Sequence, residues 1–297
     1  MSWGKSKITF IQEGHLKGGR IRNPPDYIGD IDRIRNRAIL LIHGFNSNEN
    51  EAETLYTLFR ENISRHDHGI RKINDQIIEV FWPGDTHLPI IGSLGRELAY
   101  SKKIKVAKEC GNLLSKDFFV DKLKRNNLSN MEIILIAHSL GCRLILESLR
   151  YLSLQNQHRK IKIVLMAAAV PKKFVKCGGR LYDPTKLVTS SFVMYSDTDD
   201  VLRYSFPAGQ ALAGEPGEAI GLTGDPRYTW NKKLTMNNFG HGDYWKKDDT
   251  AKNIANWLGA PILPSMLLRQ LHTRQIANNR VLNFFDKHLI SRKKSSS

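Results

Sequence analysis

Short apolar segments alternate along most of the chain with segments in which apolar residues recur at helical spacing. The apolar segments, each of strand length, cover residues 38–42, 77–81, 131–137, 162–168 and 188–195. The helical patterns cover residues 51–60, 94–123, 140–152 and 244–258. Strands that alternate with helices are typical of a parallel sheet with helices on both faces. We therefore predict the α/β class, with a doubly wound, mainly parallel sheet flanked by helices.

Two regions do not follow this alternation. Residues 7–12 are predicted to form an antiparallel edge strand. Residues 206–230 are rich in glycine and proline, yet they also contain apolar and aromatic side chains. Long loops in compact domains usually carry function, so we predict a lid-like insertion that covers a substrate pocket. The alternative is a loop that packs on the body without touching a ligand.

The domain organisation follows from the same pattern. One α/β domain is predicted over residues 1–260, and it contains the insertion at 206–230. Residues 261–297 are predicted to form a basic C-terminal helix and tail, because they contain seven Lys and Arg residues against Asp286 alone.

Composition is that of a globular protein, with 41% hydrophobic and 25% charged residues. The longest uncharged apolar run, 163–170, is much shorter than the roughly 20 residues that cross a bilayer. The N-terminus lacks the features of a secretory signal. Cys110, Cys142 and Cys177 show no metal-ligand spacing, and we interpret them as free thiols. These features predict a cytoplasmic protein.

The net charge of +16 bears on the expected partners. A strongly basic surface attracts nucleic acids, anionic lipids and acidic substrates. The excess charge is spread along the chain, however, and it contains neither a zinc-finger spacing nor an aromatic and basic RNA-binding pattern. We expect no specific nucleic acid partner and a weak contact with anionic surfaces through the basic tail. The basic run 102–105 is predicted to be a solvated helix face.

The segment Ala137-His138-Ser139-Leu140-Gly141 joins a predicted strand to a predicted helix. A nucleophilic serine at such a junction needs small residues two positions before and two positions after it, because the turn is tight. Ala137 and Gly141 meet this requirement, although alanine stands where the G-x-S-x-G pattern has glycine. We interpret Ser139 as a candidate nucleophile, with a plain turn serine as the alternative.

A nucleophilic serine needs a histidine base that a carboxylate orients. On this type of sheet the acid and then the histidine follow the serine along the chain. His241 stands between two glycines directly before the last predicted helix. The acid is expected in the turn after the strand 188–195, which contains Asp197, Asp199 and Asp200. The residue pattern alone does not decide which of these three carboxylates orients the histidine.

An oxyanion hole would complete this set of groups. One donor is predicted to be the backbone N–H of Leu140, the residue after the nucleophile. The other is predicted to be that of Phe45, in the loop after the strand 38–42. Since nucleophile, base and donors are all protein groups, no metal and no organic cofactor is implied.

Other polar residues near these motifs receive supporting roles. His43 and His138 are expected to shape the site without titrating, His138 as a packing or hydrogen-bonding neighbour. Asp243 is expected at the N-terminus of the last helix, where the helix dipole favours a negative charge.

Five short motifs in this order resemble those of the α/β-hydrolase superfamily, specifically its bacterial serine esterase or lipase-like branch of unknown substrate. The motifs are His43-Gly44-Phe45, Phe81-Trp82-Pro83-Gly84, Ala137 to Gly141, Tyr195 to Asp199, and Gly240 to Trp245. The resemblance implies that Ser139 is the nucleophile, His241 the base and Asp199 the orienting acid. It does not extend to the first 30 residues, to the 206–230 insertion or to the basic tail.

These observations predict a serine hydrolase that cleaves an ester or related acyl bond through an acyl-enzyme, using a Ser-His-Asp triad. The expected substrate is a small-molecule or lipid-like acyl compound. The alternative is a catalytically idle binding module on the same fold, which uses its basic surface for nucleic acid or an anionic membrane.

Overall fold

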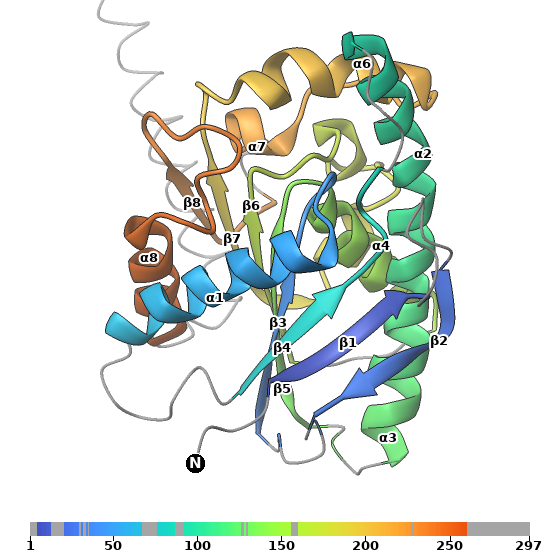
Figure 1. The fold of residues 1–297 in the computed structure, drawn as a ribbon, viewed down its shortest axis with the longest axis vertical. Coiled ribbons are helices and arrows are strands. Elements are labelled where there is room, and N and C mark those ends of the chain that lie inside the picture. Colours follow the sequence, from blue (N-terminus) through green and yellow to red (C-terminus); the bar gives the residue numbers. More distant parts are fainter. Residues whose placement is uncertain are drawn as a thin grey trace, which may run out of the picture. The chain divides into compact units, whose positions relative to one another are not determined.

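An eight-stranded sheet forms the core of the computed structural model (Figure 1). The structure describes residues 5–12, 21–29, 31, 34, 36–66, 76–86, 92–125, 128, 130–155, 160–226 and 229–259. The predicted basic helix and tail at 261–297 lies outside these described residues.

The strands are β1 (Ser6–Ile11), β2 (Ile21–Ile28), β3 (Arg37–Ile42), β4 (Ile77–Phe81), β5 (Glu132–His138), β6 (Ile161–Met166), β7 (Val188–Tyr195) and β8 (Lys232–Thr235). Their order across the sheet is β2-β1-β4-β3-β5-β6-β7-β8. Every neighbouring pair is parallel except β1 and β2, which run antiparallel. This arrangement confirms the predicted α/β class and its mainly parallel sheet.

The longer helices cover the two faces of the sheet. They are α1 (Glu49–Arg65), α2 (Gly92–Leu113), α4 (Leu140–Leu154) and α8 (Asp248–Gly259). Figure 1 shows α1 and α8 on one side of the sheet and α2 and α4 on the other. Shorter helical pieces are η3 (Leu114–Lys122), α3 (Leu123–Arg125), η4 (Lys172–Phe174), α5 (Tyr182–Thr185), η5 (Val201–Ser205), α6 (Phe206–Leu212) and α7 (Ile220–Thr223). No helix in the described part of the chain combines the length and the apolarity needed to cross a membrane.

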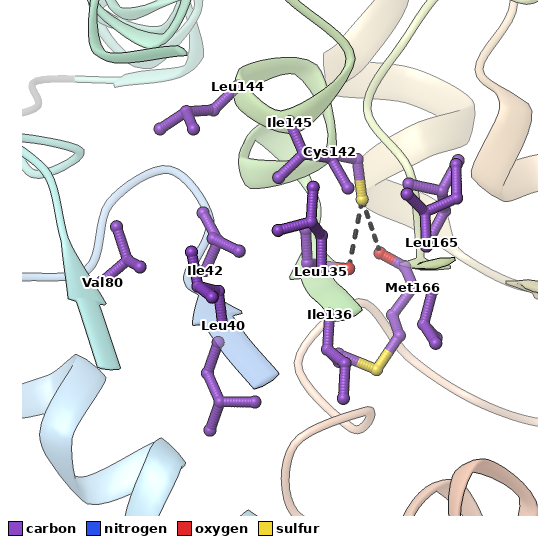
Figure 2. Packing of buried hydrophobic residues seen from close by; sticks show 14 of the residues in the cluster. Leu40, Ile42, Val80, Leu135, Ile136, Cys142, Leu144, Ile145, Leu165 and Met166 are labelled. Carbon is purple, nitrogen blue, oxygen red and sulfur yellow. Dashed lines mark hydrogen bonds between the residues drawn. The ribbon is translucent and has the colours of Figure 1, made fainter. Parts of the chain in front are cut away.

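The central strands are buried on both faces. Every residue of β4 and β6 is buried, as is every residue but the first of β3 and β5. Such strands have continuous apolar sequences, which is why the sequence predicted them. Figure 2 shows the apolar side chains between the sheet and α4, with the Cys142 thiol donating to the carbonyl oxygens of Ala137 (3.2 Å) and Met166 (3.6 Å). These contacts fix the first turn of α4 at the ends of β5 and β6.

The edge of the sheet differs from the prediction. β1 was expected to be an antiparallel edge strand, but it lies inside the sheet, antiparallel to β2 and parallel to β4. The edge strand is β2, whose sequence contains Pro24 and Pro25. Proline cannot donate a ladder hydrogen bond and is tolerated at an edge, so these residues hid the strand from the sequence pattern.

The 206–230 segment contains more regular structure than its glycines and prolines suggested. Helix α6, which begins directly after the last residue of η5, has Pro207 in its first turn. Further along, the N–H groups of Ile220 and Gly221 donate to Val170 (2.9 Å) and Ala168 (3.0 Å). This part of the segment is therefore bonded to the chain that follows β6. Its role as a lid stays a prediction.

Candidate active site

Ser139 lies between the end of β5 and the start of α4, in a strained backbone conformation. Its φ of 53° and ψ of −122° are unfavourable for a residue with a side chain. Two hydrogen bonds to the chain at β6 hold it there, from the Ser139 N–H to Met166 O (3.0 Å) and from the Ala169 N–H to Ser139 O (3.1 Å). The turn thus lifts the serine side chain out of the strand direction, as a nucleophile at this junction requires.

Two glycines permit the close packing around Ser139. A Cβ atom on Gly141 would collide with the carbonyl oxygen of His43 and lie 2.8 Å from that of Ile42. A Cβ atom on Gly44 would lie 2.8 Å from the Cβ of Ser139. The loop after β3 and the serine turn therefore meet at distances that only glycine allows.

The structure brings Ser139, His241 and Asp199 together in one chain of hydrogen bonds. His241 Nε2 lies 2.8 Å from Ser139 Oγ, and His241 Nδ1 lies 2.8 Å from Asp199 Oδ2. The carboxylate is buried, and its second oxygen accepts a bond from the Leu202 N–H (3.0 Å). Asp197 and Asp200, the two alternatives in the same turn, are exposed.

This arrangement sets the direction of the hydrogen bonds. A carboxylate can only accept, so His241 carries its proton on Nδ1 when the imidazole is neutral. Nε2 is then an acceptor and faces the Ser139 hydroxyl, which can donate to it. The three groups can therefore move a proton from serine to histidine while the carboxylate stabilises the imidazolium that forms.

The turn that carries His241 is closed by Asp243. Its carboxylate accepts from the Gly240 N–H (2.9 Å) and pairs with Lys247 (2.9 Å), whose hydrogen bond is the main cause that lowers the pKa of Asp243. The prediction that Asp243 begins the last helix is wrong, because that helix starts only at Asp248. The carboxylate acts on the turn instead of on a helix dipole.

His138 contacts His241 directly. Its Nε2–H donates to the main-chain oxygen of His241 (2.7 Å), and the two rings lie 4.9 Å apart. Burial, and secondly the charge of His241, lowers the pKa of His138 to about 3. The ring is therefore neutral at ordinary pH, and it tethers the turn that holds His241.

The loop His43 to Asn46 carries the predicted oxyanion donor Phe45. Burial lowers the pKa of His43 to about 4, and its Nε2 accepts from the Trp82 N–H (3.3 Å). The Trp82 indole donates to His43 O (2.9 Å), and the Asn46 N–H donates to Gly84 O (2.8 Å). The segment after β4 therefore clamps this loop beside the serine turn.

The N–H groups of Phe45 and Leu140 have no hydrogen-bond acceptor among the described residues. Both belong to the two turns that approach each other at Gly44 and Gly141. Their function as an oxyanion hole stays a prediction.

Lys103 is a supporting residue whose position the sequence pattern predicted wrongly. It was expected on a solvated face, but its side chain is buried and its ammonium group donates to Pro83 O (2.8 Å). Burial lowers the pKa of this lysine. The sequence contained a signal, because the four-residue spacing puts Lys103 on the same helix face as Ala99 and Ala107. Both alanines are buried in the structure.

Metal-binding side chains are not grouped near this site or elsewhere in the described ranges. Within them, no three His, Cys, Asp or Glu side chains lie so that they could hold a metal ion.

Sequence comparison places this geometry in a known family. Residues 29–210 match the family described as alpha/beta hydrolase of unknown function (DUF900). The match covers more than half of the chain, and the chain belongs to this family. No curated protein matches it in sequence.

Several solved structures are similar at low identity. An uncharacterized protein from Bacillus cereus ATCC 10987 is 13% identical over 75% of this chain and 58% of its own, with a TM-score of 0.42. This chain thus spans little more than half of that protein. An esterase from Pyrobaculum calidifontis is 10% identical over 75% of this chain and 76% of its own (TM-score 0.40). A monoacylglycerol lipase from Paleococcus ferrophilus is 10% identical over 75% and 96% (TM-score 0.33).

Proposed function

We propose that the protein is a serine hydrolase that cleaves a carboxylic ester or a related acyl bond through an acyl-enzyme. The observation that carries the proposal is the unbroken chain of two hydrogen bonds, 2.8 Å each, from Ser139 through His241 to Asp199. The strained backbone of Ser139 adds support, because such strain is concentrated at functional sites.

In the first half-reaction Ser139 Oγ attacks the carbonyl carbon of the substrate while His241 Nε2 takes the hydroxyl proton. The tetrahedral intermediate carries a negative charge on the former carbonyl oxygen. The N–H groups of Phe45 and Leu140 would donate to this oxygen. When the intermediate collapses, the bond to the leaving group breaks and His241 returns the proton to the departing oxygen or nitrogen.

Water completes the cycle. His241 removes a proton from a water molecule, whose oxygen attacks the acyl carbon attached to Ser139. The ester bond to Ser139 breaks, the serine oxygen regains a proton from His241, and the acid product leaves. Asp199 keeps the imidazole in one orientation throughout both halves.

An apolar acyl group is the substrate feature that the surroundings favour. The ring of Phe45 packs edge-on against Tyr100 at 5.4 Å, and Tyr100 lies 6.3 Å from Phe206 of the insertion. The residue of one proposed oxyanion donor thus packs on Tyr100, which in turn packs on the insertion. Hydrolysis of a series of p-nitrophenyl esters of increasing chain length would define the acyl group.

A fluorophosphonate probe, which reacts with activated serines, tests the proposal. We expect the wild-type chain to be labelled and Ser139→Ala to be unlabelled, with ester turnover lowered on the order of 10⁶-fold. The exposed helix residue Ser64 supplies the control, since Ser64→Ala should be labelled like wild type. Labelling that persists in Ser139→Ala, or an unlabelled wild type, would overturn the proposal.

A further inference from the structure

The segment Val201–Leu212 forms one helix with an unusual outer face. η5 passes directly into α6, since Ser205 and Phe206 both have right-handed helical backbone angles. The side chains of Val201, Tyr204 and Leu212 are between 42% and 66% exposed. Among residues 201–214 only Arg203 is charged. The outer face is therefore almost entirely apolar.

The inner face of this helix is apolar too, and it is already used for packing. Phe206 is buried against Tyr100, and Gly209 lies so close to that ring that a Cβ atom would be 2.6 Å from it. The side chain of Gln210 donates to the Tyr100 hydroxyl (3.1 Å). A helix that is apolar on all sides is normally covered on all sides. Here only the inner face is covered by the described residues.

The outer face lies at the end of the molecule where the candidate active site is found. The helix begins two residues after Asp199, and the Leu202 N–H donates to that carboxylate. Figure 1 shows α6 beside the first turns of α2, at the end toward which β6 and β7 point. Four of the six most exposed large apolar side chains in the described part of the chain lie on α2 or on the Val201–Leu212 helix: Leu98, Val201, Tyr204 and Leu212.

Exposed cations occur on α2, which packs against α6 through Tyr100 and Phe206. On α2, Arg96, Lys102 and Lys105 are exposed. The exposed carboxylates of Asp197 and Asp200 precede the helix, but no acidic residue occurs from Val201 to Gly214, and the whole chain carries a net charge of +16. Apolar side chains flanked by cations complement an anionic lipid surface, which offers acyl chains beneath negatively charged headgroups. Tyrosine is favoured at such an interface because one end of its ring is apolar and the other polar.

We propose that the outer face of the Val201–Leu212 helix docks on an anionic lipid surface. This inference rests on the proposed function, since docking would bring Ser139 to acyl esters held in a lipid phase. Electrostatic attraction to anionic lipid would by itself act at every basic part of the protein surface. Docking, in contrast, is specific to this helix face, whose apolar side chains make the contact.

Vesicle co-sedimentation of the full chain tests the docking surface. The probes are phosphatidylcholine vesicles with and without one third phosphatidylglycerol. We expect binding to the anionic vesicles, and Tyr204→Glu and Leu212→Glu should each weaken it at least about tenfold, because they remove apolar contact and add a charge that the headgroups repel.

Leu154→Glu is the matched control. Leu154 is 66% exposed, like Tyr204, but it lies in the last turn of α4, which begins next to Ser139 and runs away from the site. We expect this variant to bind within twofold of wild type. All three variants should hydrolyse a short soluble ester normally, which shows that they are folded and that the catalytic groups are intact.

Three results would overturn the inference. In the first, the wild type fails to bind anionic vesicles. In the second, Tyr204→Glu and Leu212→Glu bind these vesicles as tightly as the control Leu154→Glu does. In the third case, light scattering would reveal a dimer that Tyr204→Glu dissociates, and a second copy of the chain would then cover this face. Failure of the proposed function is distinguishable, because it shows as absent fluorophosphonate labelling whether or not vesicles are bound.

Discussion

Ser139 has a backbone conformation that residues with side chains rarely adopt, and two glycines let the neighbouring chain approach it. Its partners follow from hydrogen-bonding capacity. Asp199 can only accept, His241 can donate on one side and accept on the other, and the serine hydroxyl completes the chain. His43 and His138 support the site as neutral side chains, because burial lowers the pKa of both.

Asp199→Asn tests the acid. An asparagine can donate where the aspartate accepts, so it would favour the wrong tautomer of His241 and leave no charge to stabilise the imidazolium. We expect kcat to fall on the order of 10⁴-fold, as is typical of such a change in a Ser-His-Asp triad, with the fold intact. Asp200→Asn, which changes an exposed carboxylate in the same turn, should keep near-normal activity. A deeper loss at position 200 would assign the acid to that residue.

Gly141→Ala tests the packing of the serine turn. The added methyl group would meet two backbone carbonyl oxygens, and backbone atoms cannot rotate away as a side chain can. We expect the free energy of unfolding to fall by about 1–3 kcal/mol and the ester turnover to fall as well. Urea denaturation and initial rates measure the two effects. Gly242→Ala is the control, because a Cβ atom there has no neighbour within 4 Å; equal effects at both positions would contradict the argument.

At the scale of elements, the sequence predicted the strands that are buried in the centre of the sheet. The central strands were visible because they are buried on both faces and therefore continuously apolar. β2 was hidden by its two prolines, and β8 has only four residues, Lys232–Thr235, of which none is buried. The motif order predicted which loops would carry Ser139 and His241. The residue pattern could not choose among three aspartates in one turn, since that choice depends on side-chain direction, and only the family resemblance favoured Asp199.

The contacts that support the site also could not be predicted from the sequence. The clamp between the loops at His43 and Trp82 joins residues 39 positions apart. It depends on which atoms of two buried rings face each other, and no periodicity encodes this. Only the parallel pairing of β3 and β4, which brings their ends together, makes the contact understandable.

Glu215→Gln tests how the insertion is attached. The Glu215 carboxylate lies within 2.6–3.2 Å of Lys108, Arg143 and Arg180, so it joins the segment between α6 and α7 to α2 and α4. The Arg143 side chain is completely buried and pairs with both Glu147 and Glu215, so neutralising Glu215 would leave part of its charge uncompensated. We expect a loss of about 2–4 kcal/mol in the free energy of unfolding, measured in urea.

The control for this variant is Glu218→Gln. Glu218 lies three residues further along and pairs with Lys172, but its side chain is 42% exposed, against 17% for Glu215. Exposed pairs contribute little, so its replacement should leave the free energy of unfolding almost unchanged. Similar losses from both variants would mean that the insertion is not held by the Glu215 contacts.

At the scale of the whole molecule, two buried neutral histidines make stability depend on pH. The pKa of His43 is lowered to about 4 and that of His138 to about 3, both chiefly by burial. In the unfolded chain a histidine titrates near 6.5. Between these values the unfolded state binds protons that the folded state does not, so the free energy of unfolding falls as the pH is lowered from about 6.5. Each histidine contributes a slope of roughly 1 kcal/mol per pH unit.

His138→Gln isolates one of these two contributions. A glutamine amide can still donate to the main-chain oxygen of His241, but it does not titrate. We expect the free energy of unfolding between pH 5 and 6.5 to depend less steeply on pH in the variant, by about one proton's worth of slope. All other ionisable groups are common to both proteins, so their contributions cancel in the comparison. Urea unfolding at several pH values measures the two slopes, and identical slopes would mean that His138 is protonated in the folded protein as readily as in the unfolded chain.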